Sequence, residues 1–126
     1  MKAQNSLLIL VAGPYRSGTD DKPELIDKNM QFMNEVALQV YRRGHLPVLG
    51  EWFALPLIET AGSKSIGDEI FNSIFHSSAI QLLDHCDAVL RVGGASKGAD
   101  EMVKVGQDKG RMIFYKLEEI PLKDSL

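Results

Sequence analysis

The chain has 126 residues, of which 44% are hydrophobic and 25% charged, as expected of one globular domain spanning residues 1–126. Its net charge of −3 argues against a protein that binds nucleic acid through a basic surface. The longest apolar run, Leu7 to Ala12, is far shorter than the about 20 residues that span a bilayer. The single cysteine, Cys86, excludes an intramolecular disulfide, and the first residues do not predict a secretory signal. We therefore expect a cytoplasmic protein with no nucleic-acid or membrane partner.

Hydrophobic periodicity predicts strands and helices that alternate along the chain. Apolar runs that end at glycine or proline indicate strands, and apolar residues three or four positions apart indicate helices. The expected elements are strands at 6–12, 46–49, 88–92 and 112–115, helices from Pro23 to Gly44, Asp68 to Leu82 and Ala99 to Lys109, and a short turn at 117–120. This alternation predicts a small three-layer α/β domain, flavodoxin-like or Rossmann-like, with a four-stranded mainly parallel sheet. With strand order 2-1-3-4, a ligand is expected between strands one and three, at their carboxyl ends.

Residues 50–65 are the least regular part of the pattern. They mix aromatic residues, prolines and glycines, and predict a helical turn followed by a mobile segment. The run Glu51-Trp52-Phe53 follows the second strand, which Pro47 places at a sheet edge. This run is interpreted as a lid, an aromatic platform for a base or a subunit contact, or alternatively as a hydrophobic plug under a long loop.

The loop after strand one carries residues typical of an anion-binding site. It holds Gly13, Tyr15, Arg16 and Ser17 within the run Gly-Pro-Tyr-Arg-Ser-Gly-Thr. Glycine permits a close approach of the backbone to a ligand, and arginine grips an anionic oxygen with two parallel hydrogen bonds. The alternative is a tight turn with a solvated arginine.

The loop after strand three forms a second candidate anion site with Ser96, Lys97 and Gly98. Free amides at a helix start, the helix dipole, a hydroxyl and an ammonium group all favour an anion there. The pattern lacks the ending of a Walker loop, which disfavours a nucleoside triphosphatase. Alternatively, Ser96 only caps the helix. Asp100 and Glu101 follow in the first turn of this helix. The helix dipole favours carboxylates there whatever the function of the protein. Alternatively, a carboxylate beside a ligand crevice can act as a nucleophile or a general base.

Three motifs stand in a recognisable order: Ala12-Gly13-Pro14-Tyr15, Cys86-Asp87-Ala88-Val89-Leu90 and Ser96-Lys97-Gly98-Ala99-Asp100-Glu101. Together they resemble the nucleoside 2-deoxyribosyltransferase superfamily, which includes deoxynucleoside monophosphate N-glycosidases and a poorly characterised bacterial branch. The resemblance implies cleavage of the bond between a base and a (deoxy)ribose, with Glu101 as nucleophile on the anomeric carbon. It also implies that Ser96 and Gly98 hold a phosphate or sugar hydroxyl, and that Arg16 and Ser17 meet the 5′ end. A homodimer or higher assembly, in which neighbouring subunits complete the site, is implied as well.

Two positions depart from that family's pattern. The usual nucleophile position is occupied by Met102, one residue after Glu101, and the position of the family's second acid is occupied by Ala79. His76, one helical turn before Ala79, is placed by its spacing on the same helix face, where it either presents an imidazole to the site or is an ordinary surface residue. Asp87 is expected to orient the loop before strand three, and Cys86 to fill the core.

Three hypotheses follow for the function. The first is an N-glycosidase or deoxyribosyltransferase-like enzyme acting on a nucleoside or nucleotide, which requires no metal or organic cofactor. The second is a non-catalytic nucleotide-binding module on the same fold, motivated by Met102 and Ala79. The third is an assembly protein whose Trp52 region forms a subunit interface.

Overall fold

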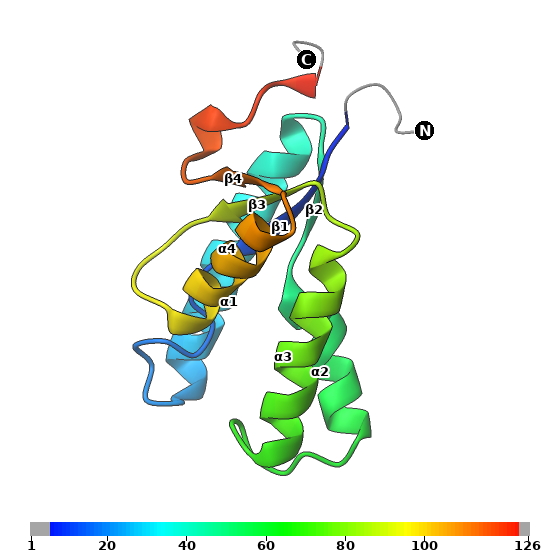
Figure 1. Ribbon diagram of the computed structural model, residues 1–126. Helices are drawn as coiled ribbons and strands as arrows, with labels where there is room; N and C mark the ends of the chain where they lie inside the picture. Colours follow the sequence, from blue (N-terminus) through cyan, green and yellow to red (C-terminus); the bar gives the residue numbers. More distant parts are fainter. Residues whose placement is uncertain (1–5, 124–126) are drawn as a thin grey trace.

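The computed structural model describes residues 6–123 and shows a single sheet of four strands flanked by helices (Figure 1). The strands are β1 (Leu8–Ala12), β2 (Leu46–Val48), β3 (Ala88–Arg91) and β4 (Met112–Phe114). The helices are α1 (Pro23–Arg42), α2 (Gly50–Thr60), α3 (Glu69–Leu83) and α4 (Lys97–Asp108), with a short 3₁₀ helix at Leu117–Glu119. The strand order is β2-β1-β3-β4 and every pair is parallel. The predicted α/β class and strand order are therefore confirmed.

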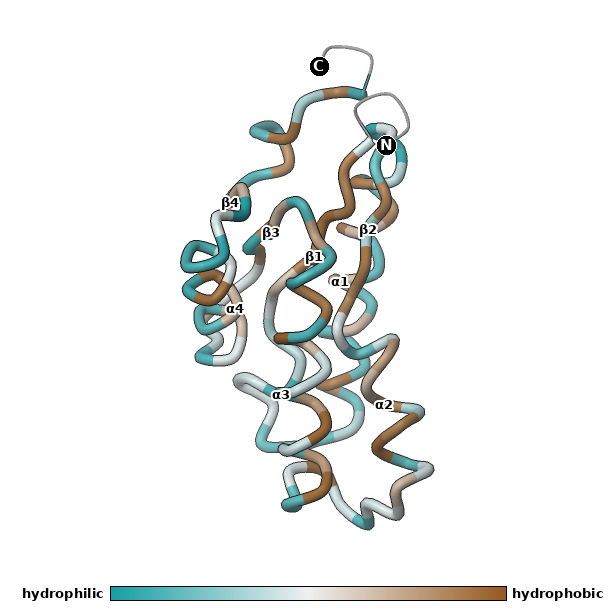
Figure 2. The backbone as a smooth tube through the Cα atoms, turned by 45° about the vertical axis from the view of Figure 1, so that its right-hand side comes forward, coloured by the Kyte–Doolittle hydropathy of each residue, from teal (hydrophilic) through white to brown (hydrophobic). Residues whose placement is uncertain are grey.

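The two faces of the sheet pack against different helices. Successive side chains of a strand point to opposite faces, so Ile9 and Val11 of β1 lie on one face and Leu10 on the other. The first face packs against the buried stripe of α1, formed by Met33, Val36, Ala37 and Val40. The second face packs against Ala79 and Leu83 of α3 and Ala99, Met102 and Val103 of α4. Figure 2 shows β1 as a hydrophobic stretch, as expected of a strand buried on both sides.

Within residues 6–123, no helix combines the length and the apolar character that crossing a membrane requires.

The segment after β2 differs from its sequence prediction, because it forms an eleven-residue helix, α2, instead of a single turn. Pro56 lies inside this helix, where it removes one backbone hydrogen bond and normally disfavours helical structure. Packing outweighs that cost: Ala54 and Ile58 are buried against Phe71 of α3. The predicted single turn is wrong because tertiary burial of α2 outweighs the local helix-breaking effect of Pro56.

The connection between α2 and α3 was predicted to be mobile, but it is a hydrogen-bonded turn centred on Asp68. The Asp68 carboxylate accepts hydrogen bonds from the backbone amides of Lys64 (2.9 Å) and Phe71 (2.8 Å) and from the Ser63 hydroxyl (2.9 Å). The Phe71 amide, together with these other donors, holds the pKa of Asp68 at about 2. Asp68 is thus the N-cap of α3, which begins where the sequence predicted.

Several element boundaries differ from the prediction by one or two residues, and two of these differences lie next to the cleft. Leu49, expected in the second strand, is the N-cap residue of α2. Helix α4 begins at Lys97, two residues before the predicted Ala99, because Ser96 and not a later residue caps it. The two-residue shift places Glu101 one half-turn further from the helix start than the sequence suggested.

The structural roles expected for Cys86 and Asp87 are confirmed. Cys86 is 2% exposed and lies in the core beneath α3 and α4. The Asp87 carboxylate accepts a hydrogen bond from the Leu8 amide at 2.8 Å, and the Asp87 amide donates one to the Leu8 carbonyl at 2.8 Å. Asp87 therefore fixes the start of β3 against the start of β1.

Candidate functional site

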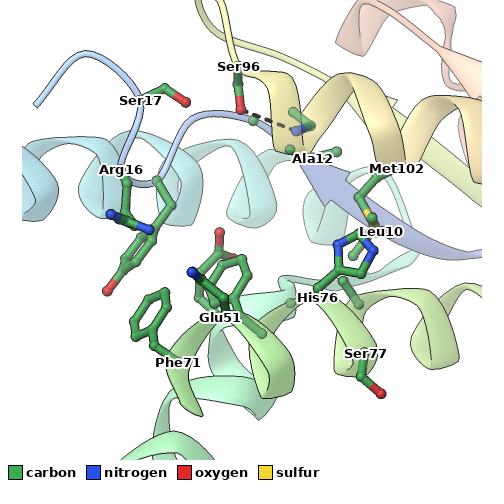
Figure 3. A pocket seen from close by; sticks show the side chains of 18 of the residues that line it. Leu10, Ala12, Arg16, Ser17, Glu51, Phe71, His76, Ser77, Ser96 and Met102 are labelled. Atoms are coloured by element: carbon green, nitrogen blue, oxygen red, sulfur yellow. Dashed lines mark hydrogen bonds between the residues drawn. The ribbon is translucent and has the colours of Figure 1, made fainter. Parts of the chain in front are cut away.

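A cleft of about 1060 Å³ opens at the carboxyl end of β1. Its walls are the β1–α1 loop, the start of α2, one face of α3 and the first turns of α4 (Figure 3). The predicted site residues that line it are Gly13, Tyr15, Arg16, Ser17, Ser96 and Gly98. Lys97 and Glu101 are not among the lining residues. The structure thus brings the two predicted loops to one cleft, as the strand order requires.

The two loops touch each other at the rim of the cleft. Gly93 has a φ of +81°, and a Cβ atom there would lie 2.7 Å from Cδ of Pro14. A Cβ atom on Gly13 would lie 2.8 Å from the carbonyl oxygen of Val92. Both positions therefore need glycine, the first for its backbone conformation as well as for space.

Arg16 is partly exposed, and two contacts hold its side chain in place. Its Nε and Nη2 atoms donate hydrogen bonds to the two carboxylate oxygens of Asp21, at 2.9 and 3.0 Å. Its guanidinium lies over the ring of Phe71, with Cζ 5.5 Å from the ring centroid. Asp20 and Asp21 both have positive φ values, 51° and 58°, so the loop adopts a conformation that non-glycine residues rarely take. The guanidinium is therefore oriented before any ligand arrives.

A row of stacked aromatic rings continues from Arg16 along the cleft. Phe71 and Phe75, one helical turn apart on α3, have ring centroids 5.4 Å apart. Tyr15 stacks on Phe75 at 5.7 Å. All three rings line the cleft. We call these three residues the aromatic row; because their faces already stack on one another, they form an apolar wall of the cleft and not a free stacking platform.

Glu51, in the first turn of α2, lines the cleft, whereas the sequence analysis named it only as part of the run 51–53 and gave it no chemical role. It is 6% exposed, and its burial raises the pKa of its carboxyl to about 6. The pKa of Tyr15 is also raised, first by burial and then by the charge of Glu51. Trp52 and Phe53, which the sequence analysis grouped with Glu51, are 41% and 51% exposed and do not line the cleft.

A signal for this orientation was present in the sequence. Glu51, Ala54 and Ile58 follow helical spacing, and all three are buried on the same face of α2. A helical interpretation of residues 50–60 would have separated Glu51 from its exposed neighbours. The interpretation of residues 51–53 as an aromatic platform or a plug is not supported, since Trp52 and Phe53 lie at the surface.

At the opposite wall, Ser96 caps α4. Its hydroxyl oxygen accepts a hydrogen bond from the Ala99 amide at 3.2 Å (Figure 3), which confirms the predicted capping role. The hydroxyl proton remains available for a ligand oxygen. Arg91 stabilises the loop between β3 and α4. Its Nε donates a hydrogen bond to the Asp100 carboxylate at 2.9 Å, and its Nη2 donates one to the Gly94 carbonyl at 2.8 Å. Asp100 is therefore engaged in structure and not in the cleft.

We expect Ser96→Ala to lower the free energy of unfolding by about 1 kcal/mol, because the first turn of α4 loses its capping acceptor. Urea unfolding followed by circular dichroism measures this difference. Ser96→Thr keeps the hydroxyl and should stay near the wild type. An equal loss in both variants would show that side-chain volume at this buried position, and not the cap, sets stability.

Glu101 does not line the cleft, but it contacts His76, which does. Its Oε1 atom is 3.3 Å from Nε2 of His76, and the two side chains are 48% and 50% exposed. His76 lines the cleft together with Ala79, in agreement with their expected place on one face of α3. Met102, next to Glu101 on α4, also lines it. The candidate nucleophile therefore lies against an imidazole that lines the cleft.

Within residues 6–123, no three His, Cys, Asp or Glu side chains lie together in a way that would hold a metal ion. Comparison with known proteins found no family model and no curated protein that matches the chain. The function is therefore argued from the cleft and from the three sequence motifs.

Proposed function

We propose that the chain binds a nucleoside or nucleoside 5′-monophosphate in this cleft and cleaves the bond between base and sugar. The observation that supports this best is the convergence of Tyr15, Arg16, Ser96 and Gly98 on one cleft, from two loops about 80 residues apart in sequence. The three motifs that resemble the nucleoside 2-deoxyribosyltransferase superfamily point to the same substrate class. No metal or organic cofactor enters this proposal.

The two walls of the cleft suit the two ends of such a ligand. A nucleobase packs against the aromatic row, because this contact removes apolar surface of both the base and the wall from water. The phosphate takes the end where Arg16 and the start of α4 meet the cleft. The first amides of a helix have no partner within the helix, and together with the dipole they favour an anion.

The reaction requires a carboxylate at the anomeric carbon. In our proposal Glu101 attacks that carbon, the base departs with the electron pair of the broken bond, and a glycosyl ester forms on the protein. Water then cleaves the ester in hydrolysis, whereas an acceptor base does so in transfer. Because Glu101 contacts His76, this proposal requires the anomeric carbon to lie beside His76 and Met102.

A second candidate is a nucleotide-binding module without turnover. The observation that favours it is the place of Glu101 outside the residues that line the cleft, with Met102 and Ala79 lining it instead. This alternative predicts the same ligand and an intact glycosidic bond after long incubation.

The experiment that separates the two candidates is chromatography of free base released from a panel of nucleosides and 5′-monophosphates, ribo and deoxy, with and without an acceptor base. Release from at least one substrate supports the enzyme, and release only with an acceptor indicates transfer. Thermal stabilisation by a panel member with no release supports the binding module. Neither release nor stabilisation by any member contradicts both.

We expect Arg16→Ala to weaken binding of a nucleoside 5′-monophosphate by about 10-fold or more, since a hydrogen-bonded charge is lost from the phosphate end. Binding of the corresponding nucleoside should change little. Lys97→Ala is the matched control, because Lys97 carries the same charge on α4 but does not line the cleft. Isothermal calorimetry measures the affinities of the wild type and both variants for the two ligands, and equal losses for nucleoside and nucleotide in Arg16→Ala would place the phosphate elsewhere.

The homodimer expected from the resemblance stays a prediction. The outer face of α2 exposes Trp52, Phe53 and Leu57, and the Trp52 indole donates a hydrogen bond to Asn34 of α1 at 3.2 Å. An exposed apolar face of this kind suits a second copy of the chain. Sedimentation velocity tests it: a monomer at high concentration contradicts the dimer, and Phe53→Glu should dissociate a dimer that uses this face.

A further inference from the structure

Glu51 is a buried acidic group that the proposed nucleophilic step does not use. It extends from the first turn of α2 into the cleft, and in the view of Figure 3 it lies between the end marked by Arg16 and Phe71 and the end marked by His76 and Met102. Its side chain is almost fully shielded from solvent, while the cleft on which it borders is open to a ligand. A ligand that fills the cleft therefore meets this carboxyl.

The surroundings of Glu51 are mostly apolar. Helix α2 packs on α3 close to this point, where a Cβ atom on Gly50 would lie 3.6 Å from that of Ala79. The titratable or charged groups that share the cleft with Glu51 are Tyr15 and Arg16 from the β1–α1 loop and Glu69 and His76 from α3. The first residues of α4 contribute only uncharged groups, Ser96, Gly98, Ala99 and Met102. Arg16, the cation among these groups, is already paired with Asp21.

We propose that Glu51 is the proton donor of the cleft, which gives its proton to the departing nucleobase. This inference rests on the proposed function. In the first step Glu101 bonds to the anomeric carbon, the carbon–nitrogen bond breaks, its electron pair stays on the base, and the Glu51 proton moves to that base. In the second step the Glu51 carboxylate takes a proton from water, whose oxygen displaces Glu101 and restores both carboxyl groups.

The environments of the two glutamates fit these separate roles. Glu101 is half exposed and faces an imidazole, whereas Glu51 is enclosed by apolar groups that disfavour its charged form. Burial raises the pKa of Glu51 to about 6, so that a useful fraction of the carboxyl carries its proton near neutral pH. A proton donor with a pKa near the working pH is the efficient one.

The test compares Glu51→Gln with the wild type on two substrates: guanosine 5′-monophosphate or its deoxy form, and the N7-methylated form of the same nucleotide. The methylated base is already cationic and leaves without a proton. We expect Glu51→Gln to lose about 100-fold or more in kcat on the ordinary substrate and to stay near wild type on the methylated one. Glu69→Gln is the matched control, because it removes an exposed carboxyl from the same cleft and should leave both rates unchanged.

Equal losses on both substrates would mean that Glu51 only supports the structure, and unchanged rates would mean that it takes no part; either result overturns the inference. If the wild type releases no base from any substrate, the cleavage proposal fails and proton donation is judged from binding. Guanosine, which has no phosphate to titrate, should then bind the wild type at least about 10-fold more weakly at about pH 8 than at about pH 5, with no such change in Glu51→Gln. The same affinity at both values, or no binding at all, overturns the inference.

Discussion

Glu101→Gln is expected to reduce the release of base by at least about 1000-fold, equivalent to about 4 kcal/mol of lost transition-state stabilisation. The amide keeps the size of the side chain and its contact with His76, but it cannot form a glycosyl ester. Glu101→Asp keeps a carboxylate and withdraws it by one carbon, so its rate should lie between the two. The measurement is chromatography of free base with the best substrate of the panel.

The matched control for this variant is Asp100→Asn. Asp100 is adjacent on α4 and pairs with Arg91 outside the cleft, so the rate should remain close to that of the wild type. Wild-type turnover in Glu101→Gln would rule out Glu101 as the nucleophile. A loss of equal size in Asp100→Asn would instead indicate that the first turns of α4 had been disturbed.

Glu51 is expected to make the free energy of unfolding fall as the pH rises. The pKa of its carboxyl is about 6 in the folded chain, against 4.5 for an unburied glutamate, so the folded state binds more protons between these values. The stabilising contribution is complete below about pH 4.5 and is lost as the pH rises through about 6. The difference between the two pKa values corresponds to about 2 kcal/mol.

Urea unfolding of the wild type and Glu51→Gln, at about pH 4, 6 and 7.5, measures this contribution. The stability of the variant relative to the wild type should increase by about 2 kcal/mol across this range, because glutamine has no proton to lose. Glu69→Gln should keep the wild-type dependence, since its side chain is exposed. A constant difference between Glu51→Gln and the wild type would contradict the raised pKa. At neutral pH the burial of Glu51 therefore lowers stability, as is common for groups at functional sites.

The sheet was predictable because its order depends on patterns that are local in sequence. Apolar runs such as residues 6–12 identify buried strands, and the alternation with helices leaves few topologies. The N-cap at Asp68 and the loop contact at Gly93 also lie in segments with a clear turn signal. Helix α2 was not predictable in the same way, because Pro56 opposes it locally and only its packing on α3 compensates.

The candidate site was predictable only where one loop supplies several of its residues. Arg16 and Ser96 stand in glycine-containing loops after strands, and both line the cleft. Glu101 and His76 are 25 residues apart in sequence and lie on two different helices, so no local sequence pattern predicts their contact. The burial of Glu51 is not predictable from local sequence either, because it depends on how α2 packs against α3.

The close contact between Pro14 and Gly93 has a consequence for how a ligand is received. The Val92 amide donates a hydrogen bond to the Ala12 carbonyl at 2.9 Å, and Pro14 and Gly93 meet just beyond it, so the starts of the two loops are held together and cannot move closer. A ligand that contacts both loops therefore meets a rim that is already assembled at this point, and less conformational entropy is lost when it binds.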